Sequence, residues 1–252
     1  RKTWKIDDYN SDLRSKMNIS ENDLIFLQAT RIADRKAIEL AIKVIGKLKT
    51  EKVKLEGKIY NGKIFSKENR IHFLMPGLIE ADSKYRNFLD SYAKKKDVEI
   101  IWCNKLMDTF RSEKKGEKIY SLWDFYAVSD FITYPSIVEG WGNQFLEGIF
   151  AKKPILIFEY PVYVTDIHPY NFKTISLGKE YRKMSYTNGQ KYARVDSKVT
   201  EKAVKEIIEI LKDGNKYRKI TEENFEIGKK YFSYEALGKD LKAILNRIKM
   251  EE

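Results

Sequence analysis

Short apolar runs alternate with amphipathic stretches along most of the chain. Each run is short and wholly apolar, as in a buried strand, whereas each amphipathic stretch repeats its apolar residues every three to four positions, as in a helix. The predicted strands cover residues 23–30, 71–77, 98–104, 130–136, 154–160 and 172–178. The predicted helices cover residues 35–48, 80–95, 118–129 and 142–153, and the chain after residue 196 is helical with breaks near 212–215 and 232–233.

Apolar, β-branched strands that alternate with helices are typical of a parallel sheet covered on both faces. We therefore predict an α/β fold: a doubly wound, mostly parallel sheet of about six strands with helices on both faces, resembling a Rossmann domain, and a helical C-terminus. Residues 21–252 are predicted to form one domain, and residues 1–20 lead into it. Residues 178–195, which contain YTNGQKY, are predicted to be irregular.

The segment 134–148, YPSIVEGWGNQFLEG, carries the most chemical information. Glu139 stands in a Gly-Trp-Gly turn after a predicted strand, and Glu147 stands in the opening turns of the next helix. Free backbone N–H groups and the positive end of a helix suit a phosphate, while the two carboxylates can accept hydrogen bonds from sugar hydroxyls. The pattern favours a nucleotide-sugar site over its alternative, a strand-turn-helix junction with two solvated glutamates.

Other polar residues follow other predicted strands. Arg31 follows the first strand, Asn104 the third and Tyr160-Pro161 the fifth. Because ligands of open α/β sheets bind beyond the carboxyl ends of the strands, we expect these residues to converge with Glu139 at one edge. No GxGxxG follows the first strand and no GxxxxGK[ST] occurs in the sequence, which disfavours dinucleotide-dependent dehydrogenases and P-loop NTPases.

Composition narrows the choice further. With 42% hydrophobic and 34% charged residues among 252, the chain is globular. The net charge of +11 indicates an anionic partner, although the lysines are spread among acidic residues. A single cysteine, Cys103, argues against disulfides, and with two histidines it disfavours a Cys/His metal site, so no metal is predicted. Without a membrane-length apolar stretch or a secretory leader, we expect a cytoplasmic location, with peripheral membrane contact as an alternative.

Three segments resemble the C-terminal, donor-binding domain of retaining GT-B glycosyltransferases of family 4, the group 1 glycosyltransferases. The segment ATRIADRKAIELAIKVI resembles the family's G-R-L-x-x-x-K-G motif, and residues 135–147 match P-S-x-x-E-G-x-G-x-x-x-L-E. Near the end, YFSYEALGKDLKAIL resembles the F-S-W segment that opens the last helix. The resemblance spans about residues 20–248 and is most specific in the middle segment.

The resemblance implies a role for each matching residue. Arg31 and Lys36 would bind the donor diphosphate, and Glu139 would bind hydroxyls of the transferred sugar; these three form the expected catalytic set. Glu147 would bind the ribose hydroxyls. The expected donor-binding set is Gly140, Trp141, Gly142, Glu147, Asn104, Lys105, Leu106 and Tyr160, with the nucleobase near residues 104–106 and the helix start around Tyr120.

The resemblance also implies a reaction. The nucleoside diphosphate leaves and the acceptor hydroxyl attacks the same face of the hexose, without a metal or other cofactor, because cationic side chains take the developing charge. The acceptor, whether sugar, lipid or small molecule, would be held by an N-terminal domain that this chain lacks. The chain alone is therefore expected to bind the nucleotide sugar with little or no turnover.

The sequence departs from the family pattern at three places. Thr30 and Ala37 stand where the family has glycine, and Tyr160-Pro161 replaces the Gly-Gly pair after the fifth strand, with Asp166 near the usual acidic position. These departures keep a non-catalytic nucleotide-sugar-binding or scaffold domain open as an alternative. Nucleic-acid binding, suggested by the charge and sixteen tyrosines, is disfavoured because the aromatics fall largely in apolar elements and no such signature is present.

Overall fold

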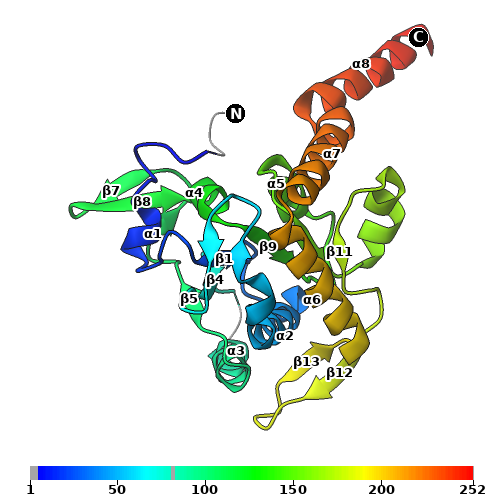
Figure 1. Ribbon diagram of the computed structural model, residues 1–252. Helices are drawn as coiled ribbons and strands as arrows, with labels where there is room; N and C mark the ends of the chain where they lie inside the picture. The colour runs from blue at the N-terminus through cyan, green and yellow to red at the C-terminus, as the bar shows by residue number, and fades with distance from the viewer. Residues whose placement is uncertain (1–4, 81–82, 252) are drawn as a thin grey trace.

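A six-stranded parallel sheet forms the centre of the computed structural model, which describes residues 5–80 and 83–251 (Figure 1). The strand order is β11-β10-β9-β1-β4-β5, and every neighbouring pair is parallel. The strands are β1 (Leu24–Leu27), β4 (Ile71–Met75), β5 (Ile100–Trp102), β9 (Phe131–Tyr134), β10 (Ile155–Ile157) and β11 (Ile175–Ser176). The predicted fold class is confirmed, and each strand is shorter than predicted because the apolar runs continue into the loops.

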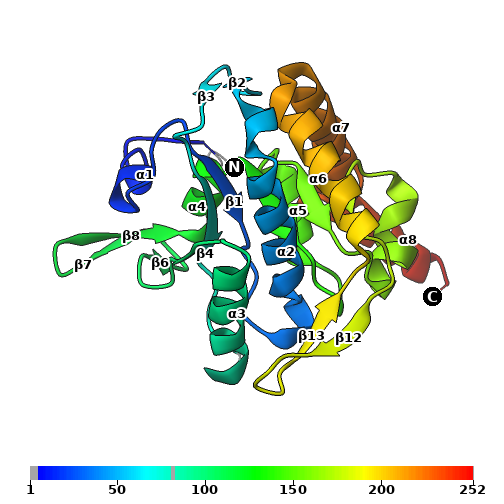
Figure 2. The same ribbon diagram turned by 60° about the horizontal axis from the view of Figure 1, so that its bottom comes forward.

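Both faces of the sheet are covered, which explains why the strands are apolar throughout. Along β1, Leu24 and Phe26 face one core, whereas Ile25 and Leu27 face the other. Helices α2, α3 and α6 cover the first face, as Figure 2 shows, and helices α1, α4 and α5 cover the second. Their bounds are Leu13–Lys16 (α1), Ile38–Thr50 (α2), Ser83–Lys95 (α3), Leu122–Val128 (α4), Asn143–Phe150 (α5) and Ser197–Lys212 (α6).

The C-terminal region is helical, as predicted. Helix α7 (Gly214–Phe232) packs on α5, and α8 (Tyr234–Glu251) extends away from the body of the domain (Figure 1). The side chain of Asp213 caps α7 by accepting hydrogen bonds from two backbone N–H groups in the first turn. Ser233 separates α7 from α8, so both predicted breaks are confirmed.

The predicted helix 118–129 is wrong in its first half. Residues Glu117–Ser121 form strand β8, which pairs with β6 (Met107–Asp108) and β7 (Ser112–Lys114) in a small separate sheet. The helix begins only after Ser121, where Ser121 and Asp124 form a reciprocal capping box. Apolar Ile119 and Tyr120 therefore belong to a strand, although their spacing also suited a helix.

The prediction of irregular structure at 178–195 is also wrong. Strands β12 (Arg182–Ser185) and β13 (Lys191–Arg194) form an antiparallel hairpin. Its tyrosines Tyr186 and Tyr192 pack against Phe88 of α3, with ring centroids 5.0 and 5.3 Å apart. The remaining short elements are β2 (Gly57–Lys58), β3 (Ile64–Phe65), 3-10 turns at Asp34–Lys36, Lys52–Leu55 and His168–Tyr170, and a π turn at Tyr163–Ile167.

The described part of the lead-in, residues 5–20, packs against the domain. The Asn10 side-chain amide donates to Asp124 at 2.8 Å, and the Tyr9 hydroxyl donates to the backbone carbonyl of Ile119 at 3.0 Å. The Arg14 guanidinium donates to the carbonyl of Val128 at 3.0 Å. Residues 5–20 thus pack on the domain and help to cover the second face of the sheet.

One buried carboxylate holds the β12–β13 hairpin to α2. Glu39 accepts a hydrogen bond from the backbone N–H of Ala193 at 2.6 Å and another from the Tyr85 hydroxyl at 2.8 Å. Burial raises the pKa of Glu39 to about 7, because three hydrogen bonds only partly offset the loss of solvent. Nearby, the Gln190 amide donates to Asp34 at 3.0 Å, so the hairpin also contacts the turn that precedes α2.

Glu39→Gln is expected to gain stability relative to the unaltered chain as pH rises. The folded protein keeps the carboxyl protonated up to a pKa of about 7, whereas the unfolded chain releases the proton near 4.5. The contribution of Glu39 is therefore complete below pH 4.5 and is lost as pH rises to 7, by about 3 kcal/mol in all. Denaturant unfolding of both proteins across this range tests the prediction, and a pH-independent difference between them contradicts it.

Candidate functional site

The candidate site lies at the carboxyl edge of the central strands. Strands β1 and β9 are neighbours although about a hundred residues separate them, and the direction of strand addition reverses between them. A crevice opens outside the carboxyl ends of strands at such a switch point, and ligands of open α/β sheets bind there. The loop after β1 carries Arg31 and Lys36, and the loop after β9 carries Glu139 through Gly142.

Lys36 and Glu139 form a buried ion pair between these two loops. The Lys36 ammonium contacts the Glu139 carboxylate, and their side chains are only 5% and 10% exposed. Lys36 ends the 3-10 turn after β1, and Ala37, with φ of 43°, adopts the left-handed conformation that turns the chain into α2. Two residues predicted from separate motifs are thus brought together, and each neutralises the other where isolated charge would be costly.

Arg31 lies apart from this pair, at the rim. Its guanidinium contacts the Glu80 carboxylate and its side chain is 60% exposed, while Arg35 lies 3.8 Å from the same carboxylate. The backbone here is fixed by Gly77, where a Cβ atom would lie 1.9 Å from the Thr30 carbonyl oxygen. The exposed Arg31 guanidinium can therefore leave the Glu80 carboxylate and bind an anionic ligand in its place.

The Gly-Trp-Gly turn places backbone groups beside Glu139. Gly142 has φ of 116°, and a Cβ atom there would lie 2.1 Å from the Tyr160 hydroxyl oxygen, so the position requires glycine. The Tyr160 hydroxyl donates to the Trp141 carbonyl at 2.8 Å, which ties the loop after β10 to this turn. Gly142 is also the N-cap of α5, so this helix begins directly at the Gly-Trp-Gly turn.

Glu147 lies further along α5 and is held by α4. Its carboxylate accepts a hydrogen bond from the Tyr126 hydroxyl at 2.9 Å, and burial raises its pKa despite that bond. A cavity of about 710 Å³ adjoins it, between α4, α5 and the junction of α7 with α8. Its lining residues are Trp123, Trp141, Asn143, Leu146, Glu147, Phe150 and residues of the segment 231–237.

Residues Asn104, Lys105 and Leu106 form the turn that follows β5, on the far side of β1 and β4 from Glu139. The Leu106 carbonyl accepts the backbone N–H of Tyr120 at 2.8 Å, which brings this turn next to the start of α4. Trp123 was not among the site residues predicted from the sequence. It lies in the first turn of α4 and lines the cavity beside Glu147. A tryptophan in a helix is usually a core residue, so only the cavity reveals it.

The loop after β10 differs most from the family pattern. Tyr160 is buried, and Pro161 leads into the π turn that contains Asp166. Asp166 is exposed and accepts a hydrogen bond from its neighbour Thr165 at 2.6 Å. Glu159 accepts a hydrogen bond from Ser176 at 2.5 Å, so the loop is fixed by side chains where a Gly-Gly pair would offer free backbone N–H groups.

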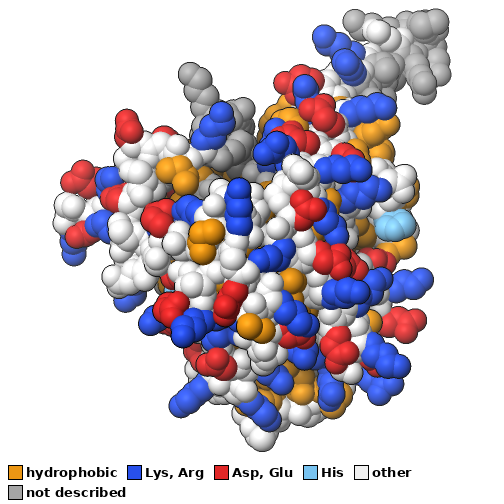
Figure 3. All heavy atoms as spheres, viewed as in Figure 1, with side chains coloured by type: hydrophobic (Ala, Val, Ile, Leu, Met, Phe, Trp, Pro, Cys, Tyr) orange, Lys and Arg blue, Asp and Glu red, His pale blue; other side chains and the backbone are white. Residues whose placement is uncertain are grey.

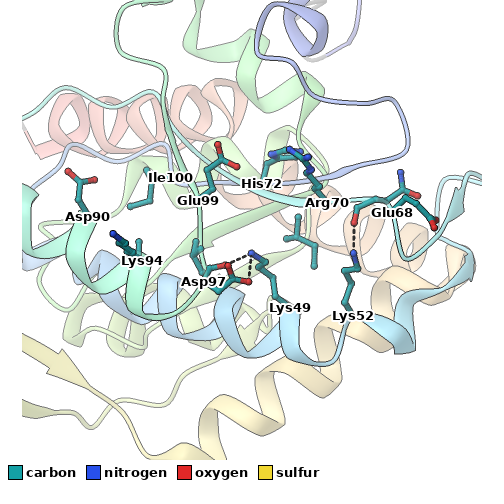
Figure 4. Close-up of a pocket in the computed structure, with 14 residues that line it drawn as sticks. Lys49, Lys52, Glu68, Arg70, His72, Asp90, Lys94, Asp97, Glu99 and Ile100 are labelled. Carbon is teal, nitrogen blue, oxygen red and sulfur yellow. Dashed lines mark hydrogen bonds and ion pairs between the residues drawn. The ribbon is translucent and has the colours of Figure 1, made fainter.

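A second hollow, of about 600 Å³, lies at the opposite, amino-terminal edge of β4 and β5 (Figure 4). Lys49 pairs there with Asp97 at 2.9 Å, and Lys52 donates to the Asn69 carbonyl at 2.7 Å. Charges of both signs line this hollow, so it offers no anion an excess of positive charge. Over the face in Figure 3, basic and acidic side chains are likewise interspersed instead of forming one basic patch.

Two searches of the described residues concern other kinds of site. Within residues 5–80 and 83–251, no group of three or more His, Cys, Asp or Glu side chains is arranged to hold a metal ion. None of the helices in that part of the chain combines the length and apolar character needed to cross a membrane.

Comparison with known proteins shows two curated relatives and a shared fold. No protein-family model matches the chain. The chain is 48% identical over 233 residues to mannosylglucosylglycerate synthase of Petrotoga mobilis, covering 92% of this chain and 52% of that protein. The synthase of the same name from Thermotoga maritima is 41% identical over 227 residues, covering 89% of this chain and 49% of the relative. The chain thus spans about half the length of the curated relatives it matches.

Solved structures show the same fold. The C-terminal domain of a group 1 family glycosyl transferase from Francisella tularensis superposes with a TM-score of 0.56 at 12% identity, covering 92% of this chain and 97% of that domain. The chain therefore shares the fold of the C-terminal domains of group 1 glycosyltransferases. HepE of Anabaena, solved with UDP and glucose, superposes with a TM-score of 0.59 at 12% identity, covering 97% of this chain and 54% of HepE. In this chain, that fold places the Lys36–Glu139 pair at the carboxyl edge of the sheet.

Proposed function

We propose that this domain binds the donor of a retaining glycosyltransferase, a nucleotide-diphosphate sugar whose hexose passes to an acceptor hydroxyl. The observation that carries the proposal is the buried Lys36–Glu139 pair at the switch point of the sheet. A lysine and a glutamate held together in a crevice offer a cation to the diphosphate and a carboxylate to the sugar hydroxyls. The resemblance to group 1 enzymes assigned these same two roles to the same two residues.

The other site residues take roles around this pair. Arg31 binds the outer face of the diphosphate, and the backbone N–H groups of Gly140–Gly142 and the start of α5 support the sugar side. Glu147 accepts hydrogen bonds from the ribose hydroxyls, and the nucleobase lies toward residues 104–106. During transfer, the bond from the anomeric carbon to the diphosphate breaks as the bond to the acceptor oxygen forms on the same face. Arg31 and Lys36 stabilise the negative charge that grows on the departing diphosphate.

The relatives suggest which sugar and which acceptor are used. Both are named mannosylglucosylglycerate synthase, and their identities of 48% and 41% extend over nearly the whole of this chain. We propose mannose as the transferred hexose and glucosylglycerate as the acceptor, in the whole protein that contains this domain together with an acceptor-binding domain. The 252-residue chain alone then binds donor without turnover.

A non-catalytic binding domain is the second candidate. The observation that favours it is the loop after β10, where Tyr160 and Pro161 replace two glycines and Tyr160 contacts Trp141. Such a domain would retain nucleotide-sugar affinity through Lys36 and Glu139 but would not support transfer when its whole protein is assayed. Transfer of mannose by the whole protein excludes this candidate.

Calorimetric titration of the chain with UDP, GDP and ADP tests the proposed site. We expect saturable binding of one nucleotide, weakened about tenfold or more by Glu147→Ala and by Arg31→Ala, because each removes a charged partner of the ligand. Lys49→Ala, at the opposite edge of the sheet, is the matched control and should leave affinity unchanged. Absence of binding by the unaltered chain at millimolar nucleotide, or equal weakening by all three variants, contradicts the proposal.

A further inference from the structure

The hydroxyl of Tyr134 is buried without a hydrogen-bond partner. Tyr134 ends β9 and is 0% exposed, and its Oη atom makes no hydrogen bond to any described residue. Leaving a buried hydroxyl unpaired costs free energy, so such groups are rare in folded proteins. An unpaired donor beside a ligand crevice indicates a bond that forms only in another state of the site.

The surroundings of Tyr134 limit what that bond can be. Its ring meets the ring of Tyr160 edge to face, with centroids 5.9 Å apart, and the Tyr160 hydroxyl is already committed to the Trp141 carbonyl. A Cβ atom on Gly142 would lie 3.2 Å from Tyr134 Oη, so the hydroxyl reaches the Gly-Trp-Gly turn. Burial raises the pKa of Tyr134, and Tyr160 and the Glu139 carboxylate raise it further, so both groups already lie beside the Tyr134 hydroxyl although neither forms a hydrogen bond of good geometry with it. The phenol therefore stays protonated and has a proton to donate to a carboxylate beside it.

The carboxylate of Glu139 is the anion beside Tyr134, and in this structure it is paired with the Lys36 ammonium. A donor diphosphate draws the Lys36 ammonium toward its phosphate oxygens. The Glu139 side chain, only 10% exposed, then loses its cation in a poorly solvated place. Without a new partner the carboxylate would rotate toward solvent or take up a proton, and in either case it would bind the sugar hydroxyls poorly.

We propose that Tyr134 is a positioning residue for Glu139, donating a hydrogen bond to its carboxylate when the donor diphosphate takes Lys36. This inference rests on the proposed roles of Lys36 and Glu139. The exchange gives the site two arrangements: a resting one in which Lys36 closes on Glu139, and a loaded one in which Lys36 holds phosphate and Tyr134 holds Glu139. Sugar recognition then follows diphosphate binding, because Glu139 is released from Lys36 only by an anion.

Tyr160 supports the same arrangement from the other side. By holding the Trp141 carbonyl it fixes the turn that carries Glu139, and its ring backs the ring of Tyr134. Tyr160 and Pro161 occupy the place where the family pattern has a Gly-Gly pair after the fifth strand. The departure at Tyr160-Pro161 thus supplies side-chain support for the sugar-binding carboxylate in place of backbone N–H groups.

The test compares the nucleoside diphosphate that the domain selects with its mannose conjugate. In the unaltered chain the conjugate should bind more tightly than the diphosphate alone, and the ratio of the two dissociation constants measures sugar recognition. Tyr134→Phe should weaken binding of the diphosphate alone several-fold, because the loaded arrangement loses one hydrogen bond, and should also reduce the ratio about tenfold, because Glu139 is then poorly held for the sugar. Because the variant removes an atom without a partner, its melting temperature should not fall. Tyr92→Phe, which removes a phenol hydroxyl on α3 far from the crevice, is the control and should leave the ratio unchanged.

A double-mutant cycle decides whether Tyr134 acts through Glu139. Glu139→Gln should abolish the sugar-dependent ratio, and Tyr134→Phe added to it should have no further effect. Additive losses show that Tyr134 binds the ligand directly and overturn the inference. A full ratio in Tyr134→Phe alone also overturns it while leaving the roles of Lys36 and Glu139 intact. If the unaltered chain binds no nucleotide, the proposed function fails and the inference fails with it.

Discussion

Lys36→Met is expected to reduce nucleoside diphosphate affinity about 100-fold and to abolish transfer by the whole protein. Lys36 is the buried cation of the crevice, with a side chain only 5% exposed, so a methionine of similar length fills its space without its charge. The substitution also leaves Glu139 without its partner, and breaking a buried pair in this way should lower stability by about 3 kcal/mol. Calorimetry and denaturant unfolding of the same preparation measure both effects.

Glu139→Gln removes the other charge of the same ion pair. It should raise nucleotide affinity, whereas Lys36→Met lowers it. The amide cannot hold Lys36 as a carboxylate does, so the ammonium is free for the diphosphate and affinity should rise a few-fold. Transfer should nevertheless fall about 1,000-fold, because the acceptor for the sugar hydroxyls is weakened. Equal weakening of nucleotide binding by both variants would show that the ion pair serves the fold and not the ligand.

Gly142→Ala is expected to destabilise the domain by about 3 kcal/mol and to remove nucleotide binding at accessible concentrations. The residue has φ of 116°, and its new methyl group would lie 2.1 Å from the Tyr160 hydroxyl oxygen. Either the turn or the Tyr160 side chain must move, and both position Glu139. Thermal unfolding and nucleotide titration measure the two consequences.

The chain offers two matched controls for Gly142→Ala. At Gly140, two positions earlier, a Cβ atom meets nothing within 4 Å, so Gly140→Ala should leave stability nearly unchanged. Tyr160→Phe removes the oxygen that the new methyl group would strike, so it should restore part of the stability lost in Gly142→Ala. If Gly140→Ala is as damaging as Gly142→Ala, the effect belongs to loop flexibility in general and not to this contact.

The sheet could be predicted because its strands are buried on both faces. Residues such as Leu24–Leu27 must all be apolar, and that continuous pattern separates them from the amphipathic helices. The same pattern gave a wrong prediction where an element is short and has only one buried face. Ile119 and Tyr120 of β8 are followed at once by a helix, so strand and helix spacing merge. The β12–β13 hairpin was missed because its core contacts are tyrosines against α3, and tyrosine patterns carry little periodicity.

The sequence placed the candidate residues at one edge of the sheet but did not predict which of them pair. The motifs placed Lys36 and Glu139 at the same edge, yet their contact joins residues 103 positions apart and depends on the order of β1 and β9 in the sheet. The interaction of Arg31 with Glu80 depends in the same way on the neighbouring strand β4. Tyr134 looked like one more apolar strand residue, because only a three-dimensional structure reveals that its hydroxyl lacks a partner.

Because the lead-in packs against α4, it can fold into place only after α4 has been synthesised. Asn10 contacts Asp124 and Arg14 contacts Val128, each across 114 positions, and β1 meets β9 across a similar span. A nascent chain that has emerged only to residue 110 therefore lacks the partners of Asn10 and Arg14. The second face of β1 stays uncovered until α4 and β9 have been made, so this half of the core closes late and through non-local contacts.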